Sequence, residues 1–182
     1  AQCASTVKKI SLELGGNAPF IVFDDADIEE AVTHCVSTKF RNCGQTCVCT
    51  NRIFVHEAVA AEFTEKLQHS IAALKVADGF EEGAEIGPLI NTQALEKMDT
   101  LMADALDKGA KVLLGGARHK LGQNFFQPTL LSNISDSMRL ANEEIFGPIA
   151  AVQTFTTEGE VVAKANATEY GLAAYFFTRD IG

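Results

Sequence analysis

The sequence lacks a long apolar segment and has little positive charge. No uncharged apolar run approaches the ~20 residues of a membrane-spanning helix, and the opening segment AQCASTVKKISLELGG has no apolar core of the kind found in secretory signals. Only 15 Lys and Arg stand against 24 Asp and Glu, for a net charge of −9. Nucleic acids and anionic membranes both need clustered Lys and Arg, so we expect neither as a partner.

The sequence also lacks the paired ligands of a structural zinc site. Such a site uses four ligands, usually as two closely spaced pairs of Cys or His. Here three of the five cysteines stand together without a second pair, and the four histidines are scattered singly. We therefore expect no metal. The odd cysteine count without a secretory signal predicts free thiols in a reducing compartment, either the cytoplasm or the mitochondrial matrix.

Apolar strand-like runs alternate with helical patterns along the 182 residues. The runs predict strands at 18–23, 52–56, 111–116, 125–131, 150–155 and 173–178. Apolar residues at helical spacing predict helices that begin near 28, 57, 92 and 158. Strands separated by single helices favour a mostly parallel sheet with helices on its faces. We therefore expect one α/β domain.

Three local signals predict where elements begin and which strand lies outside. Asp27 followed by Glu30 forms a capping box at the start of a helix. Asn91 can cap a further helix, which Gly109 ends. Pro128 predicts an edge strand, because proline has no N–H for the hydrogen-bond ladder of a sheet.

The segment FRNCGQTCVCTN places Cys43, Cys47 and Cys49 within seven positions. A disulfide between Cys47 and Cys49 would be strained and would close almost no loop, so it suits a redox switch better than a structural staple. Alternatively, Cys47 lies on a glycine-containing loop after a helix, as a nucleophile would. Glu13, in LELGGN, could then activate a water. Residue chemistry alone leaves a third reading open, since a lone cysteine often serves as a small buried apolar residue.

These segments resemble the aldehyde dehydrogenase superfamily. LELGGNAPFIVF is similar to the segment that carries the family's general-base glutamate, and FRNCGQTCVCTNRIFV to the segment that carries its catalytic cysteine. Glu13 stands 34 positions before Cys47, which matches the family spacing. EEIFGP, at 143–148, resembles the motif that contacts the nicotinamide ribose, and IGPLIN and LLGG follow the family's order.

The resemblance implies oxidation of a small aldehyde with NAD or NADP as cofactor. Cys47 takes the place of the nucleophile and Glu13 that of the base, while Glu144 and Phe146 take the positions that hold the nicotinamide riboside. The reaction would pass through a thiohemiacetal, whose oxyanion accepts a hydrogen bond from the Cys47 N–H, and a thioester that water hydrolyses to the acid.

FRNCGQTCVC is similar in particular to succinate-semialdehyde dehydrogenases, enzymes of GABA degradation. Arg41, six positions before Cys47, would bind the substrate carboxylate bidentately; alternatively, it interacts with the dipole of the preceding helix. Cys49 would be the redox disulfide partner of Cys47. Cys43 stands where the family has a small hydroxyl residue, so it competes for that pairing. Glutarate semialdehyde as substrate, or a non-catalytic redox-sensing or assembly module, remain alternatives.

Members of this family are much longer than 182 residues. Their Rossmann cofactor domain would precede LELGG, and a further part with an oligomerisation strand would follow Gly182. We therefore expect residues 1–182 to be the catalytic domain, incomplete at both ends. The separated chain should be nearly inactive, and the longer protein should be a homodimer or homotetramer.

Overall fold

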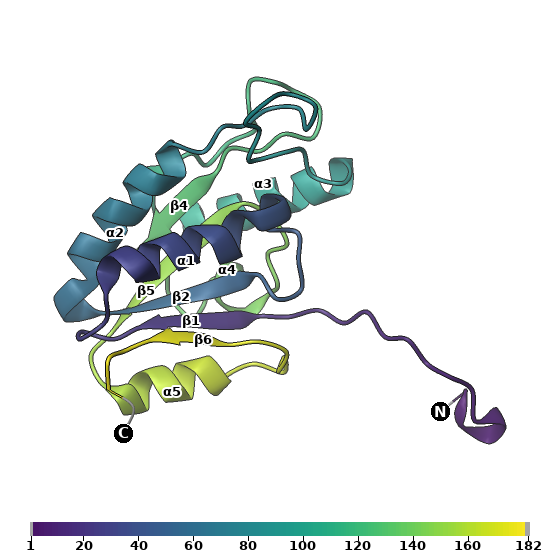
Figure 1. The fold of residues 1–182 in the computed structure, drawn as a ribbon, viewed down its shortest axis with the longest axis horizontal. Helices are drawn as coiled ribbons and strands as arrows, with labels where there is room; N and C mark the ends of the chain where they lie inside the picture. The colour runs from purple at the N-terminus through teal and green to yellow at the C-terminus, as the bar shows by residue number, and fades with distance from the viewer. Residues whose placement is uncertain (1, 181–182) are drawn as a thin grey trace.

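The computed structural model describes residues 2–180, which form a six-stranded sheet flanked by helices (Figure 1). The strands are β1 (Ala18–Val22), β2 (Thr50–His56), β3 (Lys111–Leu114), β4 (Thr129–Ser132), β5 (Ile149–Phe155) and β6 (Tyr175–Phe177). Their order in the sheet is β3-β4-β5-β2-β1-β6. All neighbouring strands are parallel except β3, which runs antiparallel to β4. The predicted α/β class with a mostly parallel sheet is confirmed.

Helices cover both faces of this sheet. They are α1 (Ile28–Phe40), α2 (Glu57–Ala72), α3 (Thr92–Asp107), α4 (Arg139–Asn142) and α5 (Glu158–Asn166), with the short 3-10 helices η1 (Ala4–Thr6) and η2 (Arg41–Gly44). Helices α1 and α2 lie side by side across one face (Figure 1). Helix α5 packs on the other face, where Val161 joins a smaller apolar cluster with Phe54 and Phe155.

The alternation of side chains along the strands explains this layering. Phe20 and Val22 of β1 point into the larger core beneath α1 and α2, whereas Ile21 between them packs on the α5 side. In β2, Ile53 likewise points into the larger core and Phe54 packs on the α5 side. Because successive residues of a strand face opposite sides, a strand that is buried on both sides reads as a continuous apolar run.

The predicted helix caps are confirmed, and the predicted edge strand is wrong. The Asp27 side chain accepts a hydrogen bond of 3.2 Å from the Glu30 N–H, and the Asn91 side chain accepts one of 2.9 Å from the Ala94 N–H. Strand β4, however, lies between β3 and β5. Pro128 directly precedes this strand rather than lying within it, so no hydrogen bond of the ladder is lost.

The segment before β1 extends away from the body as an arm (Figure 1). Its apolar side chains are exposed, with Val7 at 90%, Leu12 at 69% and Leu14 at 66%. No helix within residues 2–180 is both long and apolar enough to cross a membrane.

Candidate active site

The three predicted motifs meet at one edge of the sheet. LELGGN precedes β1, the cysteine segment precedes β2, and EEIFGP precedes β5. These three strands are parallel neighbours, in the order β5-β2-β1. Parallel strands begin at the same edge, so the segments before them are brought together. Open parallel sheets usually bind ligands at the carboxyl ends of their strands, whereas this cluster lies at the amino ends.

Two glycine contacts join the three motifs directly. Gly16 packs so closely on the carbonyl oxygen of Cys47 that a Cβ atom there would overlap it. The Gly16 N–H also donates a hydrogen bond of 2.9 Å to Oε1 of Glu144. Gly44 packs in the same way on the carbonyl oxygen of Gly147. The backbone of each motif therefore rests on the next, which only glycine permits.

The turn that carries Cys47 has an unusual backbone. After α1 ends at Phe40, Asn42, Cys43 and Gly44 all have left-handed φ angles, of 51°, 58° and 74°. A residue with a side chain loses about 1–2 kcal/mol in this conformation, so the surroundings must hold the turn in place. The result is that Cys47 is half-buried at the surface, while Cys43 and Cys49 are buried.

The three neighbouring thiols therefore have different environments. Burial raises the pKa of Cys43 to about 12, so this thiol stays protonated at neutral pH. The Cys49 Sγ lies within hydrogen-bond distance of the carbonyl oxygens of Lys39, at 3.3 Å, and Thr50, at 3.2 Å, and its one S–H can donate to either. All five cysteines are free. Among the three, the half-buried Cys47 is the thiol that a substrate could reach.

Lys39 is an unexpected member of this cluster. Its side chain is 0% exposed, and its Nζ has no hydrogen-bond partner within residues 2–180. Burial raises the pKa of Cys35, and the positive charge of Lys39 opposes the rise at both Cys35 and Cys43. The interior behind Cys47 thus holds one buried amine among thiols.

Glu13 and Arg41 are both exposed, and the structure does not bring either into a fixed contact with Cys47. Glu13 lies three positions before Gly16 and forms no hydrogen bond or ion pair with residues 2–180. Arg41 follows α1 and lines a cavity of about 370 Å³, whose other walls include Leu74, Glu85 and Ile86. Cys47 does not line this cavity. The Arg41 guanidinium has no partner among the described residues, which leaves it available to an anion.

Glu144 and Phe146 lie beside the cysteine turn. The Gly16 N–H anchors the Glu144 carboxylate. The backbone carbonyl oxygen of Glu144 accepts a hydrogen bond of 2.6 Å from Lys97 of α3. Phe146 is 37% exposed, with a left-handed φ of 55°. The carboxylate can accept hydrogen bonds from ribose hydroxyls, and the accessible ring can pack against an apolar face of a riboside. No helix within residues 2–180 begins at a glycine-rich phosphate loop, since the five α-helices are capped by Asp27, His56, Asn91, Met138 and Thr157.

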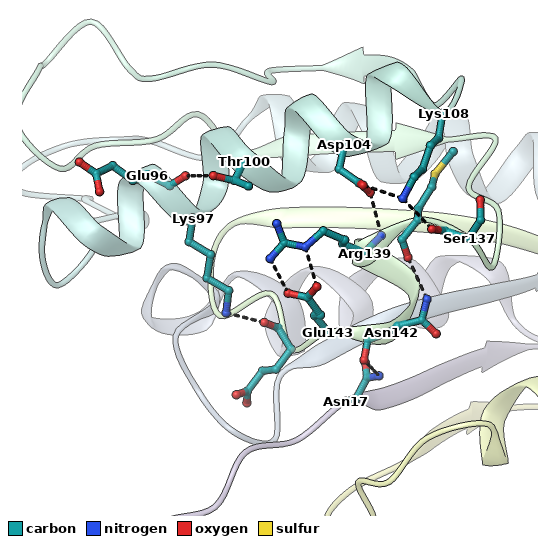
Figure 2. A network of polar contacts seen from close by, with 12 residues as sticks. Asn17, Glu96, Lys97, Thr100, Asp104, Lys108, Ser137, Arg139, Asn142 and Glu143 are labelled. Atoms are coloured by element: carbon teal, nitrogen blue, oxygen red, sulfur yellow. Dashed lines mark hydrogen bonds and ion pairs between the residues drawn. The ribbon is translucent and has the colours of Figure 1, made fainter.

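A charged network under EEIFGP was not predicted from the sequence (Figure 2). Arg139 of α4 donates to both carboxylate oxygens of Glu143, at 2.6 and 2.8 Å, and lowers the pKa of that carboxyl. The Arg139 N–H donates in turn to Asp104 of α3, at 2.8 Å. Burial lowers the pKa of Lys97, and the Glu144 and Glu143 carboxylates oppose that shift. Helix α3 therefore anchors the motif at several points.

A buried pair of asparagines was also missed. The Asn51 amide donates to Oδ1 of Asn17, at 2.5 Å, and to the Glu143 carbonyl oxygen, at 3.0 Å, while its oxygen accepts from the Ile145 N–H at 2.9 Å. One side chain of β2 thus joins all three motifs. Its position in TNRIFV, at the start of a strand with an apolar run, was the available signal, because a polar residue there is buried with its strand.

The described residues contain no group of three or more His, Cys, Asp or Glu side chains that could hold a metal ion.

Comparisons with known proteins agree over the whole length. The family model described as "Aldehyde dehydrogenase family" matches residues 1–182. The NADP(+) succinate-semialdehyde dehydrogenase of Escherichia coli is 53% identical over 180 residues, which are 99% of this chain and 37% of that protein. A glutarate-semialdehyde dehydrogenase of Pseudomonas aeruginosa is 50% identical over 181 residues, 100% of this chain and 38% of that protein.

A solved structure gives the same result for the fold. The crystal structure of succinate-semialdehyde dehydrogenase from Burkholderia pseudomallei superposes with a TM-score of 0.96 at 56% identity, and the match covers 100% of this chain and 38% of that one. The chain thus spans a little over one third of the length of the relatives that it matches.

Proposed function

Because this chain belongs to the aldehyde dehydrogenase family, we propose that it is the catalytic segment of a longer NAD(P)-dependent enzyme that oxidises succinate semialdehyde to succinate. The observation that carries the proposal is the contact of Gly16 with both Cys47 and Glu144, which joins the base, nucleophile and cofactor motifs. The match to about 37% of the relatives' length supports the catalytic-segment assignment.

Cys47 would begin the reaction. Its thiolate attacks the aldehyde carbon and forms a thiohemiacetal, whose oxyanion accepts a hydrogen bond from the Cys47 N–H. This N–H has no acceptor among residues 2–180, which supports the role. NAD or NADP, held by Glu144 and Phe146, would supply the hydride acceptor that this oxidation to the thioester requires. Glu13 then removes a proton from a water that attacks the resulting thioester, which releases the acid and the Cys47 thiol.

Glu144 and Phe146 would hold the nicotinamide riboside end of the dinucleotide. The Gly16 N–H occupies one carboxylate oxygen of Glu144 and so orients the group beside the Cys47 turn. The phosphates would be held by a part of the longer protein outside residues 2–180, because no helix within residues 2–180 begins at a glycine-rich loop. Both NAD and NADP suit this riboside end; the Escherichia coli relative is named for NADP(+).

Arg41 would bind the carboxylate at the far end of the substrate. Its guanidinium, which has no partner among the described residues and lines a cavity of mixed polar and apolar walls, supports this role, because a guanidinium binds a carboxylate through two parallel hydrogen bonds. We expect Arg41→Ala to raise KM for succinate semialdehyde at least about 10-fold and to leave KM for a neutral aldehyde of the same length unchanged. An equal effect on both aldehydes would exclude the role. Glutarate semialdehyde is the substrate in another relative's name. Comparing its KM with that for succinate semialdehyde shows which length of substrate the site prefers.

The proposal is tested in a chimera in which this chain replaces the matching segment of the Escherichia coli enzyme. We expect the chimera to reduce the dinucleotide with succinate semialdehyde, Cys47→Ser to abolish turnover, and Glu13→Gln to let the thioester accumulate after one turnover. Turnover by the Cys47→Ser chimera would overturn the nucleophile, and unchanged turnover by the Glu13→Gln chimera would overturn the base.

Two further parts of the proposal concern the longer protein. We expect the separated 182-residue chain to bind the dinucleotide weakly and to be nearly inactive, so ordinary turnover by this chain alone would contradict the catalytic-segment assignment. We also propose a homodimer or homotetramer for the longer protein, which sedimentation would measure directly.

A further inference from the structure

Gln45 lies two positions before Cys47, and its side chain is fully engaged. Its Oε1 accepts a hydrogen bond of 2.8 Å from the Ile90 N–H. Its Nε2 donates to the carbonyl oxygens of Asn42, at 3.1 Å, and Pro88, at 3.4 Å. One amide thus connects the turn that carries Cys47 to the 88–90 segment, which is more than forty positions away in the chain.

The 88–90 segment is a firm support for this amide. It belongs to the loop between α2 and α3, and its middle residue, Leu89, is 1% exposed. The Leu89 N–H donates to the Asn124 carbonyl oxygen at 2.9 Å. Ile90 is 77% exposed, and its N–H donates to the Gln45 side chain rather than to another backbone group. The same loop supplies Glu85 and Ile86 to the cavity of Arg41.

The turn that carries Cys47 needs such a support. Asn42 and Cys43 both have side chains and both adopt left-handed φ angles, a conformation that persists only when the surroundings impose it. The Gln45 backbone is bonded to Asn42 as well. Its carbonyl oxygen accepts from the Asn42 side chain at 3.1 Å, and its N–H donates to the Asn42 carbonyl oxygen at 3.1 Å. Gln45 therefore closes the turn and also attaches it to the 88–90 segment.

From these contacts we infer that Gln45 is a positioning residue for the reaction. Its amide holds the turn of Cys47 against the 88–90 segment and so sets the place of the thiol relative to the cavity wall formed by Glu85 and Ile86. The inference rests on the proposed function of Cys47 as the nucleophile. Gln45 itself touches neither substrate nor cofactor in this role.

The bond to Ile90 is tested by amide hydrogen exchange on the 182-residue chain. Gln45→Ala should remove the protection of the Ile90 N–H, which then exchanges at least about 10-fold faster. Gln68→Ala is the matched control, because Gln68 also donates one amide hydrogen bond to a backbone carbonyl, that of Leu113, far from the turn. Ile90 should be unchanged in that control. Equal exchange at Ile90 in the wild type and Gln45→Ala would overturn the inference.

The consequence for the reaction is tested in the chimera described above. A misplaced nucleophile lowers the chemical step, so Gln45→Ala should lower kcat roughly 10- to 100-fold and leave KM for the dinucleotide unchanged. Gln45→Glu keeps the shape and the acceptor for Ile90 but removes both donors, so it should keep Ile90 protected and still lower kcat. This isosteric variant also covers the case in which Gln45→Ala does not fold.

The two levels of proposal fail in different ways. If Cys47→Ser abolishes turnover while both Gln45 variants keep full kcat, the positioning role is wrong and the nucleophile stands. If Cys47→Ser keeps turnover, the proposed function fails whatever Gln45 does.

Discussion

Gly16 and Cys47 are packed backbone to backbone, with the Cα of Gly16 directly against the Cys47 carbonyl oxygen. The same glycine donates its N–H to the Glu144 carboxylate. A single residue without a side chain thus sets how closely the LELGG segment approaches the thiol. Because Cys47 and Glu144 are themselves held by buried or half-buried groups, the contact between Gly16 and Cys47 has little freedom to adjust.

This relationship predicts the effect of a methyl group at position 16. Gly16→Ala should lower the free energy of unfolding by about 1–3 kcal/mol, because the added Cβ overlaps backbone atoms that cannot move aside. Urea unfolding of the separated chain measures this. Gly159→Ala is the control: nothing lies within 4 Å of a Cβ at this position in α5, and alanine there should be neutral or stabilising by up to ~1 kcal/mol. Equal stability of the two variants would show that the close approach is absent.

Alkylation should separate the cysteines of the cluster. Cys43 becomes a thiolate only as the pH approaches its raised pKa of about 12, and it is buried. Below pH 9 we therefore expect iodoacetamide to label Cys47 at least about 10-fold faster than Cys43, because the thiolate is the reacting form. Peptide mass spectrometry at several pH values gives both rates. The difference should shrink in urea, where Cys43 returns to its ordinary pKa; equal rates in the folded chain would contradict the assigned environments.

The buried amide of Asn51 predicts a large cost for an isosteric change. Asn51→Asp places a carboxylate oxygen against Oδ1 of Asn17 or the Glu143 carbonyl oxygen in place of a donor. We expect a loss of about 2–3 kcal/mol or more, since buried acceptors lose their partners and gain a charge. The exposed Asn133 donates one comparable bond to the Gly109 carbonyl oxygen, and Asn133→Asp should cost about 1 kcal/mol at most. Thermal and urea unfolding of both variants decide the comparison.

Lys39 predicts a stabilising substitution. A buried amine whose Nζ has no hydrogen-bond partner within residues 2–180 costs about 1–3 kcal/mol, and methionine has a similar length and shape without a polar nitrogen. Lys39→Met should therefore raise the free energy of unfolding by about 1 kcal/mol or more. Lys97→Met is the contrasting variant, because the Lys97 Nζ donates to the Glu144 carbonyl oxygen, and its loss should cost about 1–2 kcal/mol. A loss of stability in Lys39→Met would mean that the buried amine has a partner.

Features that depend on neighbouring residues in the chain were predictable. Asp27 with Glu30, and Asn91 with Ala94, begin helices because a cap acts over three residues. The alternation of apolar runs and helical patterns was enough for the α/β class. Helix α4 was missed because four residues are too short to show a helical period. Pro128 misled the strand order because the missing N–H of a residue just before a strand says nothing about which strands lie on either side of β4.

The sequence by itself determined the strands and the longer helices, the α/β class and the identity of three motifs, because these depend on local backbone preferences and on residues a few positions apart. Only the tertiary structure decided that Gly16 rests on Cys47, that Asn51 joins all three motifs, and that Lys39 is sealed in the interior. The reason is physical. The parallel order of β5, β2 and β1 sets which segments meet at one edge of the sheet, and contacts between such distant positions leave no periodic pattern along the chain.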